Sequence, residues 1–121
     1  MGKKVKIRAE SERSFFQRAR KDARAIDAGD PRPRPSELSF ASPELLFTVL
    51  TANRWALLKV LRASGPSSIR ALAKRLDRDY RRVHADVKAL MEIELVERDA
   101  ERKILVPWSR ITTELAMDQA A

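Results

Sequence analysis

One short stretch of the sequence carries side chains suited to contact nucleic acid. Four polar residues fall on one side of a helix there, at spacings of one, three and four: Tyr80, Arg81, His84 and Lys88. Arg81 is suited to a bidentate contact with guanine O6 and N7, and a phosphate contact is an equal alternative. We expect Arg82 and Lys88 to contact phosphate. Tyr80 can contact a phosphate or a thymine methyl, or its ring can lie half-buried on the turn. We expect His84 to make a hydrogen bond at the surface.

Two further pairs of residues complete the expected DNA-binding set. Arg102 and Lys103 lie at a polar tip between two short apolar segments, where a cation can enter a narrow minor groove. Simple solvation is the alternative there, because two nearby acids dilute the charge. The remaining residues of the expected DNA-binding set are Ser67 and Ser68. We expect Ser67 to cap a helix over 69–76.

The composition excludes much of enzyme chemistry. The 121 residues hold 25 Lys+Arg and 17 Asp+Glu, for a net charge of +8, with one His and no Cys. Thiolate chemistry, disulfides and Cys-ligated metals are therefore absent, and three isolated glycines build no phosphate loop. We expect no catalytic residue, no metal and no cofactor. Without an apolar run that could span a bilayer, we expect a cytoplasmic protein that does not bind membranes.

The elements that position these residues form a compact pattern. A helix over 69–76, a break over 77–79 and a second helix over 79–93 precede a two-stranded ribbon over 95–106. The second helix has an apolar row that ties it to a core: Val83, Val87 and Leu90. This order is typical of a winged helix-turn-helix, so the predicted fold class is mainly α with a small β-wing. The sequence pattern does not decide whether the segment from Trp108 on is a strand or a helix.

Two residues bear on how the helices pack. Ala73 is small where the two helices cross. Asp86 would repel phosphate, so we expect it to pair with Arg82 four residues before it or to hold Arg78.

The N-terminal third carries most of the positive charge. Residues 1–35 hold 11 Lys+Arg and 5 Asp+Glu, so +6 of the net +8 lies there. Val5 and Ile7 alternate with basic residues, which predicts a short strand at a sheet edge. Ser11 can cap a helix that ends near Gly29 and carries an apolar stripe for core, dimer or partner packing: Phe15, Phe16, Ala19, Ala23 and Ile26.

A proline-rich segment separates this extension from the rest. Three prolines at alternate positions over 30–36 favour a stiff, extended linker. We therefore predict an N-terminal strand-helix extension with linker over 1–35 and a winged helix-turn-helix domain over 36–121.

Five motifs between Phe40 and Trp108 carry a family resemblance. They are Leu50-Thr51-Ala-Asn-Arg54, Gly65-Pro66-Ser67-Ser68-Ile69, Leu72-Ala73-Lys-Arg-Leu76, Arg78-Asp79-Tyr80-Arg-Arg-Val83-His84-Ala-Asp86-Val87 and Leu105-Val106-Pro107-Trp108. With these motifs the chain resembles the small MarR-like predicted transcriptional regulators of bacteria and archaea. The resemblance implies a winged-helix DNA-binding regulator. It also implies a possible role as an autoregulatory antitoxin.

One position departs from that family. Glu94 stands before Leu95, where the family has a glycine that ends the helix in the left-handed conformation. Glu94 must adopt this conformation at some cost, or the helix must end differently.

Two functions follow as hypotheses. The first is a sequence-specific transcriptional regulator that binds double-stranded DNA as a homodimer, through the N-terminal helix or the terminal strands. The alternative is a DNA-binding antitoxin whose residues 1–35 bind an acidic protein partner, a toxin.

Overall fold

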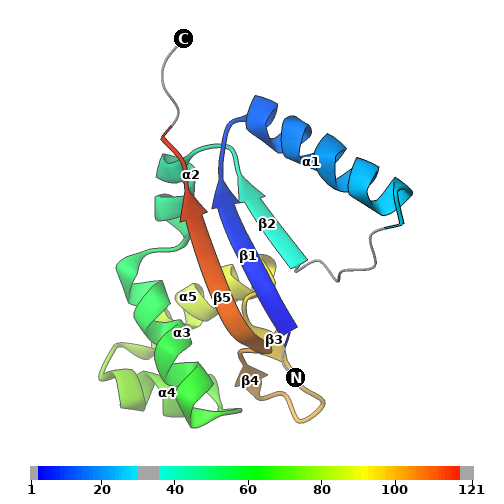
Figure 1. Ribbon diagram of the computed structural model, residues 1–121. Helices are drawn as coiled ribbons and strands as arrows, with labels where there is room; N and C mark the ends of the chain where they lie inside the picture. The colour runs from blue at the N-terminus through cyan, green and yellow to red at the C-terminus, as the bar shows by residue number, and fades with distance from the viewer. Residues whose placement is uncertain (1–2, 30–35, 118–121) are drawn as a thin grey trace. The chain divides into compact units, whose positions relative to one another are not determined.

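The computed structural model describes residues 3–29 and 36–117, which form an α+β structure of five helices and two small sheets (Figure 1). The strand content exceeds the expected small wing, because the N-terminal region and the segment from Trp108 build a sheet. The elements are β1 (Lys3–Ala9), α1 (Glu12–Asp27), β2 (Ser36–Phe40), α2 (Pro43–Val49), α3 (Ala52–Ser64), α4 (Ile69–Leu76), α5 (Tyr80–Glu92), β3 (Glu97–Arg98), β4 (Ile104–Leu105) and β5 (Trp108–Leu115).

The chain divides into two compact units. The helical unit runs from Phe47–Ser109, and the sheet unit combines Lys3–Leu46 with the segment that begins at Arg110. The expected boundary after residue 35 thus falls inside the sheet unit. The proline-rich linker over 30–35 lies outside the described residues.

The helical unit is built around an apolar core from α3, α4, α5 and the hairpin β3–β4. Its fully buried side chains are Leu57, Leu61, Leu72, Val83, Val87, Leu90, Leu95, Val96 and Ile104. The three helices contact one another pairwise. Thr51 and Asp79 cap α3 and α5 by accepting from the backbone N–H of Arg54 and Arg82.

The expected cap of α4 is wrong by one residue. Ser68, not Ser67, is the N-cap, and its Oγ accepts from the N–H of Ala71 at 3.1 Å. Ser67 is buried, because its N–H and C=O both bond to Ile104 of the hairpin, at 3.0 and 2.8 Å. This bridge fixes the start of α4 against β4.

The sheet unit has β1 in the middle rather than at an edge, with the strand order β2-β1-β5 (Figure 1). β2, which the sequence did not predict, pairs in parallel with β1, with Ile7 opposite Leu38. Val5 and Ile7 are buried on one face, as their alternation indicates. Lys6 and Arg8, which alternate with these residues, do not guard an edge but pair with acids of the flanking strands.

These ion pairs join the three strands on the polar face of the sheet. Arg8 contacts Glu37 of β2 at 3.3 Å and Glu114 of β5 at 2.7 Å, and Lys6 contacts Glu114 at 3.1 Å. The hydrogen bond from Lys6 and the charge of Arg8 hold the pKa of Glu114 below its usual value. Its contribution to stability is therefore present above the pKa of the unfolded chain and is lost as the pH falls through the folded pKa.

Helix α1 begins and ends as the sequence predicts. Ser11 accepts from the N–H of Ser14, and Gly29 follows the helix with a φ of 84°. No residue of α1 is buried, however, so the Phe15–Phe16 pair does not enter the core. No helix of the described residues combines the length and apolar character that a membrane crossing requires.

Of the two alternatives given for Glu94, the structure shows the left-handed conformation, with a φ of 64°. Its N–H bonds to the C=O of Met91 at 3.0 Å, and its own C=O accepts from Trp108 Nε1 at 2.9 Å. The backbone thus gains the turn that a glycine would give, with a side chain that disfavours it.

We expect Glu94→Gly to raise the free energy of unfolding by about 0.5 to 1 kcal/mol, because glycine adopts this φ without steric cost. Urea unfolding followed by circular dichroism measures the change. Glu92→Gly, in the last turn of α5, is the matched control and should instead lower stability. A loss of stability for both variants would contradict the strain assigned to Glu94.

Candidate nucleic-acid interface

A tight turn sets α5 against α4. Asp77 ends α4 in the left-handed conformation with a φ of 50°, and its N–H bonds to the C=O of Lys74 at 3.1 Å. The N–H of Arg78 bonds back to Ala73, also at 3.1 Å, which satisfies another carbonyl at the end of α4. Ala73 is buried, as expected for a small residue at the helix crossing.

Helix α5 has one buried and one exposed side. Its buried side chains are Val83, Val87 and Leu90. The residues predicted to bind DNA lie on the rest of the helix and are exposed: Tyr80, Arg81, Arg82, His84 and Lys88. Arg81 and Lys88 are seven residues apart, so both lie near the middle of the outward side. The structure thus brings this part of the predicted set together on one helix.

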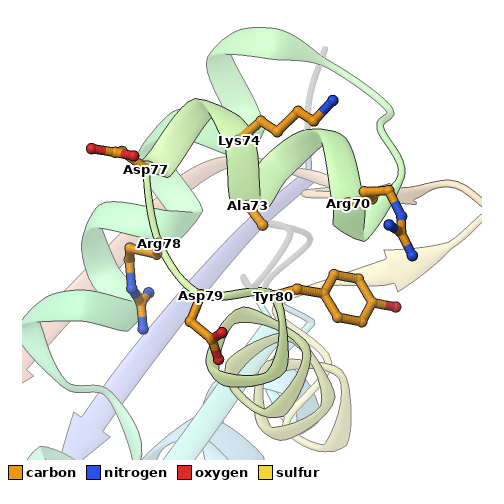
Figure 2. Close-up of a pocket in the computed structure, with 7 residues that line it drawn as sticks. All are labelled: Arg70, Ala73, Lys74, Asp77, Arg78, Asp79 and Tyr80. Carbon is orange, nitrogen blue, oxygen red and sulfur yellow. The ribbon is translucent and has the colours of Figure 1, made fainter.

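Tyr80 has a partner that the sequence analysis did not identify. The guanidinium of Arg70, in the first turn of α4, lies 5.2 Å from the centre of the Tyr80 ring. Figure 2 shows both side chains extending side by side from α4 and α5. Both residues line a pocket of about 460 Å³. This cation–π contact holds Tyr80, which is 42% exposed, at the surface. Only the crossing of the helices brings the two residues together.

A second hollow lies between α5 and the hairpin. Its volume is about 410 Å³, and its lining includes His84 and Lys88 of α5 and Arg98 of β3. Arg98 was not among the predicted residues, because its place in the same hollow as Lys88 depends on how the hairpin packs on α5, which the sequence pattern does not give. Two cations from different elements therefore line one concave surface.

The hairpin tip is shaped by Asp99. Its Oδ1 accepts from the backbone N–H of Glu101 and Lys103, both at 2.9 Å. Arg102 takes a left-handed φ of 64° at the turn, and Arg102 and Lys103 are exposed. The carboxylate of Asp99 thus folds the tip that presents the two predicted cations.

The two predicted serines differ in access to the surface. Ser68 is exposed at the start of α4, but its Oγ already caps that helix. Ser67 is 6% exposed, and its Oγ donates to the C=O of Ser68 at 3.0 Å. Ser67 therefore contributes to packing under α4 rather than to the exposed cluster.

Asp86 holds α5 against its neighbours. One carboxylate oxygen accepts from Arg54 Nε of α3 at 3.0 Å, and the other accepts from Arg78 Nη2 of the turn at 2.7 Å. Arg54 Nη1 also donates to the C=O of Val49 at 2.7 Å. Of the two expected partners of Asp86, Arg78 is the one that pairs with it. Arg82 remains exposed.

Comparison with known proteins adds a family match. A family model described as HVO_A0114 matches residues 49–113, more than half of the chain and nearly all of the helical unit. No curated protein and no solved structure matches the chain.

We expect Asp86→Ala to lower the free energy of unfolding by about 1 to 3 kcal/mol, because it leaves two partly buried guanidinium groups without their acceptor. Urea unfolding gives the value. Glu92→Ala removes an exposed acid from the same helix and should change stability by less than about 0.5 kcal/mol. Equal losses in the two variants would argue against Asp86 as a bridge between elements.

Proposed function

The chain belongs to the HVO_A0114 family, and for this member we propose sequence-specific binding of double-stranded DNA as a transcriptional regulator. The observation that carries the proposal is α5, whose exposed cations lie opposite a buried apolar row. A rigid helix that presents cations and amphipathic side chains is what entry into the major groove requires.

We propose that the helical unit is a winged helix-turn-helix of the MarR-like type. In this interpretation α4 and α5 are the helix-turn-helix, and the hairpin β3–β4 is the wing. The tight turn at Asp77 and the Ser67–Ile104 bridge support it, because they fix the first helix to both the second helix and the hairpin. The sequence resemblance to MarR-like regulators supports the same fold.

The contacts divide into those that read bases and those that bind the backbone. Arg81, in the first turn of α5, is the candidate for guanine recognition, since recognition helices read bases mainly through their N-terminal residues. Arg82 and Lys88 are assigned to phosphates. Arg70 beside Tyr80 and Arg98 beside Lys88 add cations at the two ends of this surface. Arg102 and Lys103 of the wing tip are assigned to the minor groove.

We propose that the protein acts as a homodimer on a two-fold symmetric site, with recognition helices about 34 Å apart. β5 is an edge strand of the three-stranded sheet, so it supports the terminal strands as the dimer contact. The antitoxin function stays a prediction.

We expect Arg81→Ala to weaken binding to a DNA site selected from random sequence by about 1 to 3 kcal/mol and to relax the preference at one base pair. Electrophoretic mobility shifts on the selected site and its single-base variants measure both effects. Arg62→Ala, an exposed arginine of α3, is the control and should leave both unchanged. If affinity and base preference survive Arg81→Ala, the assignment of α5 as recognition helix is wrong.

Lys88→Ala should lower the affinity for the selected DNA site and for unrelated DNA by the same factor, because a phosphate contact carries no sequence information. The slope of log affinity against log salt should decrease by about one unit, as one fewer counterion is released. Fluorescence anisotropy at a series of salt concentrations gives the slope, with Lys59→Ala of α3 as the exposed control. An unchanged slope would place Lys88 away from the DNA.

A further inference from the structure

Helix α1 packs on its own unit through its polar side. The half-buried residues of α1 recur at helical spacing and are Ser14, Arg18, Asp22 and Ala25. Arg18 bonds to Glu10, with its Nε 3.1 Å from Glu10 Oε1, and also pairs with Glu37 of β2. The hydrogen bond to Glu10, followed by that to Glu37, raises the pKa of Arg18. Ion pairs rather than apolar contacts therefore hold this side of the helix.

The apolar stripe of α1 is left exposed by this packing. Phe15, Phe16 and Ile26 are 37%, 49% and 58% exposed, and Ala19 and Ala23 between them are also exposed. The two phenylalanine rings contact each other edge to face, with centroids 5.5 Å apart. A helix usually turns such a stripe toward a core, and an exposed stripe on one helix face is typical of an interaction site.

A row of arginines borders one side of this stripe. Arg13, Arg20 and Arg24 lie together at helical spacing next to Phe16 and are exposed. In the part of the chain that the structure describes, no carboxylate pairs with any of the three. The opposite side of the stripe is the side that packs on the sheet. The outward face of α1 thus combines apolar residues with a single row of unpaired cations.

We propose that this face of α1 binds an amphipathic helix of another protein, one that carries a row of Asp or Glu beside its apolar residues. The apolar rows would bury each other in the way of a helix packed on a helix, and the acids would meet Arg13, Arg20 and Arg24. Charge complementarity then sets the orientation of the partner and excludes basic helices. The proposal does not rest on DNA binding, which is assigned to residues of the other unit.

The distribution of charge favours an acidic protein over a membrane or a nucleic acid. Glu12 lies three and four residues before Phe15 and Phe16, and Asp27 lies four residues after Ala23, so both acids are on the side of the stripe. At an anionic bilayer these carboxylates would be pressed against lipid headgroups with the apolar side chains. Phosphates of DNA would meet the same two acids and would leave the stripe unburied. A partner helix, in contrast, can set apolar residues against Glu12 and Asp27 and its own acids against the arginine row.

A second copy of this chain also fits poorly. In a two-fold antiparallel pair of α1 helices, the same flanks face each other, so the arginine row would oppose its own copy. In a parallel two-fold pair, the arginine row would face the opposite flank, which is occupied by the sheet. Like charges in the first case and the sheet in the second disfavour self-association through this face.

The test uses the full chain and two synthetic helical peptides of about 18 residues, or five turns. Both have a leucine stripe, flanked by Glu in one peptide and by Lys in the other, and binding is followed by fluorescence anisotropy. We expect saturable binding of the Glu peptide and binding of the Lys peptide that is weaker by about tenfold or more. Phe16→Ser and Arg20→Glu should each lower the affinity of the chain for the Glu peptide by about fivefold or more.

Lys21→Glu is the matched control, because it makes the same charge change on the side of α1 away from the stripe. Lys21→Glu should lower the affinity for the Glu peptide by less than Arg20→Glu does. Circular dichroism checks that each variant folds, and each variant should retain the DNA affinity of the parent chain. Loss of peptide binding with DNA binding intact therefore tests the α1 face separately from the proposed DNA-binding function.

Four outcomes would overturn the proposal. They are no saturable binding of the Glu peptide, equal binding of the two peptides, equal effects of Arg20→Glu and Lys21→Glu, and peptide affinity unchanged by Phe16→Ser in a folded chain. Binding to phosphatidylglycerol vesicles in preference to the Glu peptide would assign the face to membranes. Self-association that Phe16→Ser abolishes, measured by analytical ultracentrifugation, would assign it to a second copy.

Discussion

The helical unit depends on one carboxylate shared between two guanidinium groups. Asp86 joins α5 to α3 through Arg54 and to the α4–α5 turn through Arg78, and Arg54 extends the link to the end of α2 at Val49. Arg78 Nη1 is buried without a hydrogen-bond partner among the described residues, so Asp86 is the group that offsets the desolvation of this arginine. Apolar packing alone lets a helix rotate or slide, whereas a bridge with two donors fixes its direction. Together with the buried apolar row of α5, this contact fixes which side of the helix faces outward.

The two units keep their elements together by different means. Helices α3, α4 and α5 meet through leucines and valines, whereas α1 meets its sheet through Arg18, Glu10 and Glu37. These ion pairs are only partly buried, so salt screens them more than it affects a buried apolar core, and we expect α1 to be the more weakly attached helix. The cations of the chain also serve different purposes. Lys6 and Arg8 of β1 pair with acids of the flanking strands, whereas the outward cations of α1 and α5 are available to other molecules.

Local features of the structure were accessible from the sequence, and distant pairings were not. The apolar row of α5 follows from its spacing and was predicted, whereas the left-handed Glu94 was one of two alternatives that the family resemblance left open. The central place of β1 was missed because its partners lie far along the chain. The cap at Ser68 was assigned to Ser67 because nothing near Ser67 reveals its bridge to Ile104. Arg70 reaches Tyr80 only through the angle between two helices, which a sequence pattern does not contain.

The place of β1 between β2 and β5 has a consequence for the order in which the chain acquires its structure. Arg8 and Glu114 are separated by 106 positions, so the contact that joins β1 to β5 forms late during synthesis. The helical unit lies between the two strands in sequence, so nearly all of it is synthesised while β1 still lacks one neighbour. Until β5 emerges from the ribosome, one edge of β1 presents free backbone groups. The cations of this strand, Lys3, Lys4, Lys6 and Arg8, disfavour pairing of this open edge with a second copy until Glu114 is in place.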